Sequence, residues 1–378
     1  MAEGSEILID GITKSFGKTT VWRDMSFTIP RGEISVLLGP SGTGKSVFLK
    51  CLIGLLRPEF GRIVIHDTDL MRTKSNRLYE LRKLFGVLFQ DGALFGSMDV
   101  FDNVAFPLRE HTDKNERQVR EIVMEKLELV GLTGHERKLP GEISGGMRKR
   151  AGLARGLVLD PEIMLFDEPD SGLDPVRTAY LNQLIVDLNE RTDSTFLIVT
   201  HNIDTAQTLP DNIGIIYHKH LAMFGPREQL LTSEDAVVSQ FLNGRREGPI
   251  GMSEEKDASE QAAEKEGSKS ELALPPMKPQ LSPTNGNPRK AEARRKERVM
   301  AMMHELTPAA QAAVRGGLGE TGRNGNGRGP NGHGPNGGER GYGGERGYSA
   351  DGGYSADGGY SGDGGRGYDP RHRADRQR

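Results

Sequence analysis

The sequence predicts an α/β fold with a largely parallel sheet. Three observations support this fold class. Short apolar segments alternate with helical stretches between residues 6 and about 243, which is typical of α/β domains. Residues 39–46 read GPSGTGKS and match the phosphate-loop pattern G-x-x-x-x-G-K-[ST] between an apolar segment and a helix. A second apolar segment, 163–166, ends in the carboxylate pair Asp167 and Glu168.

The expected strands are short apolar segments separated by turn residues and helices. They comprise residues 7–12, 26–29, 34–38, 61–65, 86–89, 163–166, 195–199, 213–217 and 221–224. Several expected helices carry Ser, Asp or Pro near their start, where these residues cap a helix or fit its first turn. The clearest helices are 45–54, 116–130, 144–158, 175–190 and 204–209.

Composition changes after about residue 244. The 50 glycines gather near the C-terminus and only 35% of the chain is hydrophobic, so we assign the globular domain to residues 1–244. A helical subdomain is expected within it, at about 91–158. Residues 245–315 are rich in Glu, Lys, Ser and Pro, which predicts a polar linker. Residues 316–378 are rich in Gly and Tyr and predict a disordered, low-complexity tail.

One segment of the predicted linker has helical character. Residues 291–306 combine a basic first half with a Met-rich second half, and they predict a short helix. Two interpretations remain open: a solvated, partly formed helix, or a docking element for a partner.

Charge and cysteine content exclude several classes of protein. A net charge of -3 gives no strong positive field for nucleic acid or anionic membranes, so no nucleic-acid partner is expected. The one cysteine, Cys51, cannot form an intramolecular disulfide and is expected to pack as a small buried side chain, which fits the cytoplasm. The N-terminal residues lack a secretory pattern, and no apolar run reaches about 18 residues. Any function at a membrane would therefore require another, membrane-spanning chain.

The phosphate loop predicts where ATP and magnesium bind. Backbone amides of residues 42–46 should face the phosphates at the positive end of the following helix. Lys45 would bridge the β- and γ-phosphates, and the Ser46 hydroxyl would ligate Mg²⁺. The expected ATP-binding residues of the loop are Gly39, Pro40, Ser41, Gly42, Thr43, Gly44, Lys45 and Ser46.

The two carboxylates after residues 163–166 should lie beside this loop, because the carboxyl ends of parallel strands share one edge of the sheet. Asp167 would hold Mg²⁺ together with Ser46. Glu168 would orient and deprotonate the attacking water, as the catalytic base.

A third motif, ISGGM at residues 143–147, stands at the head of a helix just upstream of the Asp-Glu strand. With it, residues 7 to about 243 resemble the ATP-binding cassette (ABC) ATPases. This resemblance implies a head-to-tail dimer in which the signature residues Ser144, Gly145 and Gly146 bind the γ-phosphate held by the other subunit. Backbone amides at a helix start can approach an anion closely when the side chains are small.

The same resemblance assigns roles to four further residues. Gln90 would touch Mg²⁺ and the attacking water and sense the permease, and His201 would contact the γ-phosphate as the switch histidine. Asp174, in the SGLD segment 171–174, would line the dimer seam and bind ATP. Phe16 would stack on adenine, with core packing as the other interpretation.

The signature departs from the common family form LSGGQ at two positions. Ile143 replaces Leu, which conserves volume, whereas Met147 replaces Gln and removes an amide. We expect ATPase activity to survive both changes.

Residues 89–112 read FQDGALFGSMDVFDNVAFPLREHT and, with SGGM, resemble the Mce-associated and Mla-type lipid-transport ATPases. The long polar tail makes the actinobacterial Mce-associated group the most similar. In transporter ATPases the apolar residues here form a groove for the coupling helix of a permease, although some must be ordinary core. These residues are Leu94, Phe95, Met98, Val100, Phe101 and Phe106.

This resemblance implies a homodimer of the chain beneath two YrbE-type permeases, at the cytoplasmic face of the plasma membrane, with Mce proteins forming the route across the envelope. The cargo would be a lipid: fatty or mycolic acids, sterols or phospholipids. The cofactors would be ATP and Mg²⁺.

Other functions remain open. The chain could serve another class of ABC transporter, or act as a soluble ABC protein on ribosomes or DNA. Soluble ABC proteins usually have tandem cassettes or a coiled coil between Gln90 and Ser144, which here are about 54 residues apart, so a transporter is favoured. The Arg and Tyr residues of the tail could stack on RNA bases, but the interleaved Asp and Glu weaken that hypothesis.

Overall fold

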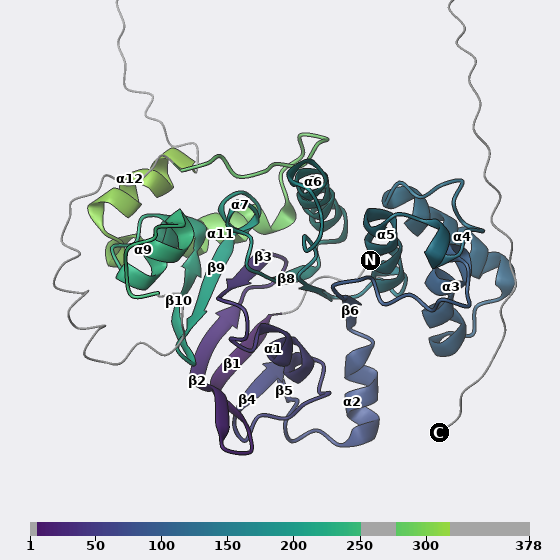
Figure 1. The fold of residues 1–378 in the computed structure, drawn as a ribbon, viewed down its shortest axis with the longest axis horizontal. Coiled ribbons are helices and arrows are strands. Elements are labelled where there is room, and N and C mark those ends of the chain that lie inside the picture. Colours follow the sequence, from purple (N-terminus) through teal and green to yellow (C-terminus); the bar gives the residue numbers. More distant parts are fainter. Residues whose placement is uncertain (1–5, 251–276, 318–378) are drawn as a thin grey trace, which may run out of the picture. The chain divides into compact units, whose positions relative to one another are not determined.

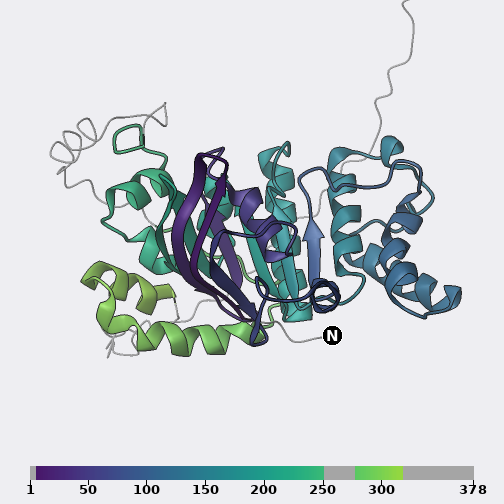
Figure 2. The ribbon, with the colours of Figure 1, turned by 90° about the horizontal axis from the view of Figure 1, so that it is seen from below.

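The computed structural model describes residues 6–250 and 277–317 of the 378-residue chain. This part contains two sheets, a group of helices beyond one edge of the larger sheet, and a C-terminal helical segment (Figures 1 and 2). Nearly all of the tail predicted at 316–378 lies outside the described residues. Within the described ranges, no helix is both long enough and apolar enough to span a bilayer.

The larger sheet has six strands in the order β10-β9-β3-β8-β7-β6. Its strands are β3 (Ile34–Leu38), β6 (Phe85–Leu88), β7 (Ile163–Asp167), β8 (Thr195–Thr200), β9 (Asn212–Tyr217) and β10 (His220–Pro226). All neighbours pair in parallel except β9 with β10. Strand β3 is apolar apart from Ser35 because both faces of the sheet are covered: Val36 and Leu38 belong to one core cluster and Leu37 to another.

The smaller sheet is antiparallel, in the order β2-β1-β4-β5. Its strands are β1 (Ile7–Phe16), β2 (Thr19–Ile29), β4 (Phe60–Ile65) and β5 (Thr68–Asp69). The hairpin of β1 and β2 extends beyond the predicted segments 7–12 and 26–29, because pairing continues to Phe16 opposite Thr19. The added residues are largely polar and partly exposed, so an apolar pattern does not reveal them.

Helices pack against the larger sheet and lie beyond its edge (Figure 1). They are α1 (Lys45–Leu52), α2 (Ser75–Arg82), α3 (Val100–His111), α4 (Glu116–Leu129), α5 (Gly145–Leu157), α6 (Pro175–Thr192), α7 (Ile203–Thr208), α8 (Arg227–Leu231) and α9 (Ala236–Asn243), with a 3₁₀ turn at Pro140–Glu142. Helices α3, α4 and α5 lie beyond edge strand β6 and fall within the predicted helical subdomain (Figure 1). The sequence did not predict α2, which is mostly polar, or α3, which contains Pro107. Cys51 is fully buried on α1, as expected.

Residues 277–317, here called the C-terminal segment, lie almost entirely within the polar linker predicted for 245–315 and contain a helix where a short one was predicted, at 291–306. They form α11 (Lys290–Ala301), a 3₁₀ turn (Met303–Glu305) and α12 (Pro308–Gly317). Figures 1 and 2 show α11 lying against the core near β9. Four arginines attach the segment to acidic side chains of the core: Arg289 to Asp211, Arg294 to Asp193, Arg295 to Glu228 and Arg298 to Glu33.

The composition of this segment was misleading for a physical reason. A run of Arg, Lys and Glu resembles a solvated linker, yet Arg289 and Arg295 are 8% and 5% exposed because their partners are buried carboxylates. A sequence pattern cannot show that a charge has a distant buried partner.

Candidate nucleotide-binding site

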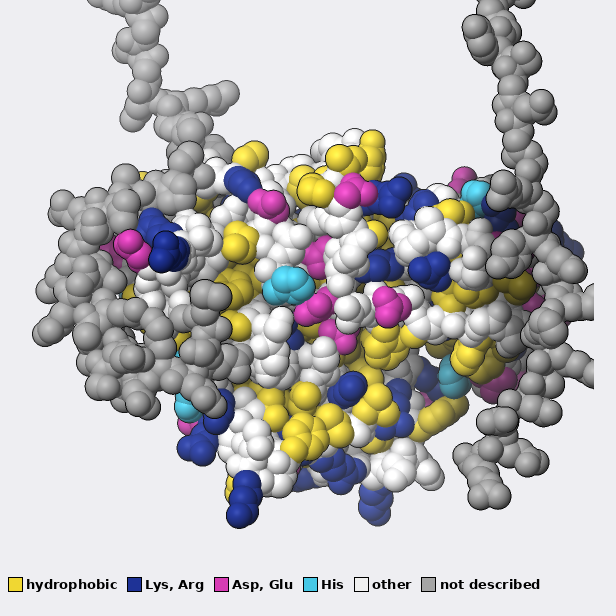
Figure 3. Space-filling model, viewed as in Figure 1, with side chains coloured by type: hydrophobic (Ala, Val, Ile, Leu, Met, Phe, Trp, Pro, Cys, Tyr) yellow, Lys and Arg dark blue, Asp and Glu magenta, His cyan; other side chains and the backbone are white. Residues whose placement is uncertain are grey.

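The predicted site residues gather at the carboxyl ends of β3, β7 and β8. In the sheet Leu38 pairs with Thr200, and Asp167 pairs with Val199. The phosphate loop, the two carboxylates and His201 therefore leave the sheet at the same edge. Figure 3 shows a histidine and acidic side chains close together near the middle of this view, over the region where Figure 1 places β3 and β8.

The phosphate loop has the conformation that its glycines permit. Gly42 and Gly44 have φ values of 85° and 86°, a left-handed conformation that favours glycine. A Cβ on Gly44 would come within 2.1 Å of Val21 Cγ1, so this position also lacks room for a side chain. Gly44 is the N-cap of α1, which leaves the first backbone amides of that helix pointing out of the loop.

Lys45 is bound to its own loop. Its Nζ donates hydrogen bonds to the carbonyls of Gly39 (2.7 Å) and Pro40 (2.9 Å), and the residue is 4% exposed. Burial lowers the pKa of Lys45, while the charges of Glu168 and Asp167 oppose that shift. The ammonium group is thus held beside the two carboxylates by carbonyl groups that an anionic ligand could replace.

Ser46 and Asp167 form a pair of oxygen donors. The Ser46 hydroxyl donates to Asp167 Oδ1 at 2.8 Å. Burial raises the pKa of Asp167, and this hydrogen bond opposes the shift. Hydroxyl and carboxylate oxygens are ligands that suit Mg²⁺, which binds through few protein groups and completes its shell with water and phosphate. A serine hydroxyl and one carboxylate fit a Mg²⁺ ion whose other ligands are phosphate and water.

Glu168 faces His201. Glu168 Oε1 lies 3.4 Å from His201 Nδ1, and the Glu168 amide donates to the Val199 carbonyl at 2.9 Å. Glu168 has φ +46°, a left-handed conformation that costs a non-glycine residue about 1 kcal/mol or more. The chain therefore holds this carboxylate in a strained position that directs it toward the histidine.

Gln90 follows β6 and reaches the loop after Glu168. Its Nε2 donates to Ser171 Oγ at 3.1 Å. This contact brings together two segments that lie 81 residues apart in the sequence.

The signature residues lie at the start of α5. The Ser144 hydroxyl caps the helix by accepting a hydrogen bond from the Met147 amide at 3.3 Å. A Cβ on Gly145 or Gly146 would meet no atom closer than 3.6 Å, so packing within this chain does not require glycine there. The space left open lies outside the fold, where a second molecule could approach.

A cavity of about 630 Å³ adjoins the signature, and none of the phosphate-loop residues 39–46 lines it. The residues that share this cavity with Ser144 and Gly146 come from α4, α5, α6 and the segment before α6. Asp174 caps α6, accepting from the Arg177 amide at 2.9 Å, and its carboxylate pairs with the Arg177 side chain at 3.2 Å.

Phe16 stands at the end of β1 and is 50% exposed. Lys14 Nζ lies 5.0 Å from the centre of its ring, within range of a cation–π interaction. An exposed aromatic ring is available for stacking, and core packing does not account for it.

Helix α5 contributes two groups that the sequence prediction missed. Lys149 donates to the carbonyls of Pro169 and Ser171, and Arg155 donates to those of Gly92 and Ala93. Both residues follow the signature closely, on a helix whose other buried residues are small or apolar. Basic residues in a helix of small and apolar residues are the sequence feature that could have identified them.

A groove of about 510 Å³ lies between α2, β6, α3 and α5, and Phe89, the residue before Gln90, is part of its lining. Its walls include Tyr79, Phe95, Phe106, His111 and Arg155. Of the six apolar residues predicted to form a groove, Phe95 and Phe106 line it and their rings lie 5.0 Å apart, whereas Val100 and Phe101 are buried in the core.

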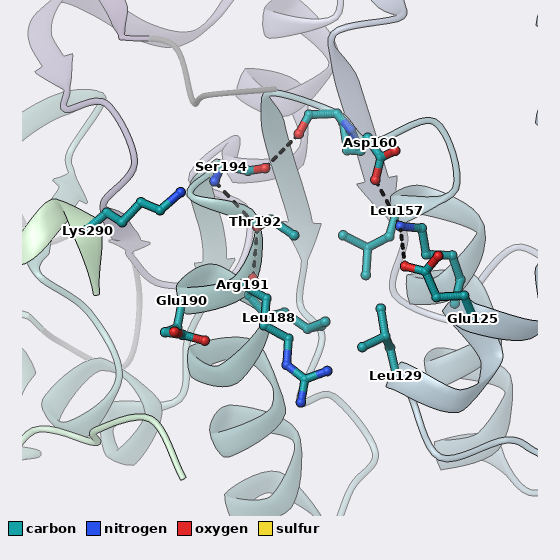
Figure 4. Close-up of a pocket in the computed structure, with 12 residues that line it drawn as sticks. Glu125, Leu129, Leu157, Asp160, Leu188, Glu190, Arg191, Thr192, Ser194 and Lys290 are labelled. Carbon is teal, nitrogen blue, oxygen red and sulfur yellow. Dashed lines mark hydrogen bonds and ion pairs between the residues drawn. The ribbon is translucent and has the colours of Figure 1, made fainter. Parts of the chain in front are cut away.

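A third cavity, of about 410 Å³, separates α4 from the end of α6 (Figure 4). Lys126 in its wall donates to Asp160 (2.9 Å) and Glu125 (3.4 Å), two carboxylates labelled in Figure 4. Lys126 is thus paired with carboxylates, and none of the predicted site residues lines this cavity.

Comparisons with known proteins agree with this geometry. A family model described as ABC transporter matches residues 22–171. The chain is 64% identical over 320 residues to the Mycobacterium tuberculosis protein named probable ribonucleotide transport ATP-binding protein mkl, which covers 82% of this chain and 89% of that protein. It is 42% identical over 244 residues to the intermembrane phospholipid transport system ATP-binding protein MlaF of Haemophilus influenzae, covering 65% of this chain and 92% of that protein.

The fold also resembles a solved ATP-binding cassette, a dimer in a post-hydrolysis state bound to ADP and Pi. The TM-score is 0.54 with 26% sequence identity, over 58% of this chain and 98% of that one.

Proposed function

Because this chain belongs to the ATP-binding proteins of ABC transporters, we propose that it powers an Mce-type lipid importer, by ATP-driven dimerisation coupled to two YrbE-type permeases. The chain is an ABC ATPase and binds ATP. The observation that carries the transport proposal is the groove lined by Phe89, Phe95 and Phe106, which offers a docking surface one residue along the chain from Gln90.

The geometry supports hydrolysis by positioning and electrostatics. Lys45 would exchange its two loop carbonyls for the β- and γ-phosphates. Glu168, already directed toward His201, would take a proton from the attacking water while His201 contacts the γ-phosphate. Ser46 and Asp167, together with Gln90, would hold Mg²⁺, which supplies positive charge to the phosphates.

Two copies of the chain would complete each site. The open space at Gly145 and Gly146 supports this proposal, because small residues at a helix start suit an anion brought by a second molecule. A dimeric cassette bound to ADP and Pi is among the similar structures. In such a dimer Ser144 would contact the γ-phosphate bound by the other copy, with Asp174 near the seam.

The groove supports docking of a permease helix. Phe95 is 44% exposed and lies at its wall, with the Arg155 guanidinium 5.9 Å from its ring centre. An exposed aromatic ring beside a cation suits a helix that presents apolar side chains together with an acidic one. Docking there would place this chain at the cytoplasmic face of the plasma membrane, held by its permeases.

Replacing Phe95 by Ser should release the permease. The ring contributes exposed apolar area to the wall of the groove, so we expect at least a tenfold drop in the amount of permease that copurifies from membranes. Leu55→Ser is the matched control, because Leu55 is 58% exposed and lies outside the groove. Equal recovery of permease with both variants would contradict the docking proposal.

The cargo is a lipid in this proposal, as in the name of the MlaF relative, whereas the mycobacterial relative is named for ribonucleotide transport. Residues 89–112 and the SGGM signature favour the lipid. Purification of the chain with its permease, followed by mass spectrometry of bound small molecules, separates these candidates. Fatty acids, sterols or phospholipids would support the proposal, and ribonucleotides without lipid would overturn it.

A further inference from the structure

Helix α5 connects the signature motif to the loop that follows the proposed catalytic base. Ser144 caps the helix, and Lys149 lies just over one turn further along it. The Lys149 ammonium group donates hydrogen bonds to the carbonyls of Pro169 (2.8 Å) and Ser171 (2.5 Å). A side chain of the helical subdomain thus binds the backbone on both sides of Asp170.

The loop bound by Lys149, residues 169–171, also forms a hydrogen bond with Glu168. The Ser171 amide donates to the Glu168 carbonyl at 3.1 Å. On its other side, the Asp170 carboxylate accepts hydrogen bonds from the hydroxyls of Thr200 (2.9 Å) and Thr205 (3.0 Å). The loop is therefore held from the core by Asp170 and from the helical subdomain by Lys149, and a shift of α5 would move it.

The same helix also holds the loop after Gln90. A Cβ on Gly152 would lie 2.9 Å from the Gly92 Cα, which shows close packing of helix and loop. Arg155 donates to the carbonyls of Gly92 (2.9 Å) and Ala93 (2.8 Å). Helix α5 thus contacts both loops that flank the proposed catalytic residues.

Lys149 is buried in a way that suits a positioning role. It is 5% exposed, and burial lowers its pKa while Asp170, Asp91 and Glu168 oppose the shift. Its two hydrogen bonds go to backbone carbonyls, which fixes the course of the chain more directly than an ion pair between mobile side chains.

We propose that Lys149 is a positioning residue that couples the two ATP sites of the dimer. It transmits the position of the signature helix, which contacts the ATP of the second copy, to the loop that sets Glu168 beside the ATP of its own chain. This inference rests on the proposed dimeric function and adds to it a route from one site to the other.

The test is the ATP dependence of hydrolysis by the full-length chain. We expect a sigmoidal dependence for the wild type. Lys149→Met keeps the length of the side chain but removes its donors. It should lower kcat about ten- to a hundredfold, because displacing a reacting group by about 1 Å has effects of this size. The Hill coefficient should fall toward 1, and the affinity of the isolated chain for ADP should change less than about twofold.

Two further variants separate coupling from folding. Lys149→Arg retains donors for the two carbonyls and should recover most of kcat and the cooperativity. Lys126→Met removes another buried lysine of the helical subdomain, one bound to Asp160 and Glu125 (Figure 4). It should reduce thermal stability while leaving the Hill coefficient unchanged.

Two results would be decisive against the inference. If Lys149→Met lowers the melting temperature but keeps the wild-type kcat and Hill coefficient, Lys149 is structural and the coupling role is refuted, although the dimer stands. If the wild type shows no ATP-induced dimer and no cooperativity, the dimer proposal fails and the coupling role falls with it.

Discussion

Glu168→Gln is expected to lower ATP turnover by about 10²- to 10⁴-fold, the usual contribution of a general base. The amide cannot accept the proton of the attacking water. It keeps nearly the same shape, so the left-handed backbone at φ +46° and the contact with His201 can persist. ATP should still bind, and the unhydrolysed nucleotide should hold two copies of the chain together. Steady-state phosphate release and size-exclusion chromatography with ATP measure the two effects.

Glu162→Gln is the matched control for this variant. Glu162 precedes β7, whereas Glu168 follows it, so the two carboxylates flank one strand at opposite edges of the sheet. We expect wild-type turnover for Glu162→Gln. Normal turnover by Glu168→Gln would show that another group activates the water.

Arg289→Met is expected to destabilise the fold by about 3–5 kcal/mol, the usual effect of removing one partner from a buried ion pair. Arg289 contacts both oxygens of Asp211, at 2.6 and 2.5 Å, and Asp211 is 1% exposed. Asp211 also accepts a hydrogen bond from the amide of Ile34, the first residue of the strand that leads into the phosphate loop. Chemical denaturation at pH 7 measures the change in unfolding free energy.

The neighbouring residue provides the control. Lys290 is exposed on the same helix, so Lys290→Met should change the unfolding free energy by less than about 0.5 kcal/mol. Equal stability of the two variants would show that the C-terminal segment is not held to the core by this ion pair.

Lowering the pH should reduce the difference in unfolding free energy between Arg289→Met and the wild type. Burial by itself would raise the pKa of Asp211, but Arg289 and Arg295 lower it to about 2, below the usual 3.8. A carboxyl group whose pKa is lower in the folded than in the unfolded state stabilises the fold at pH values above the unfolded pKa. This stabilisation is lost as the pH falls toward the folded pKa. The unfolding free energies of the two proteins should therefore differ most above about pH 4 and converge as the pH falls toward 2.

Much of the α/β core could be predicted from the sequence because its elements are locally coded. Strands β3, β7 and β8 are continuous apolar segments, and the phosphate loop is defined by glycines that adopt left-handed conformations at residues 42 and 44. Helices α2 and α3 could not be predicted in the same way, because one is polar and the other contains Pro107. Helix α2 depends on tertiary packing. In α3 the apolar residues Val100, Val104 and Leu108 do recur at helical spacing, but Pro107 obscured that pattern.

The sequence by itself determined the order of the motifs: the phosphate loop, ISGGM, the Asp-Glu pair and His201. It determined the family as well, since each motif depends on residue type and spacing within a few positions. Whether Ser46 meets Asp167, and Glu168 meets His201, was decided by the tertiary structure, because parallel pairing brings distant strand ends to one edge.

The tertiary structure also decided what the polar residues do. Lys149, Arg155 and Arg289 resemble ordinary surface charges in the sequence, yet each is buried or partly buried and bonded to a group between 20 and 78 residues away. A charge acquires such a role only from the partner that folding brings to it, and that partner is not encoded near it in the chain.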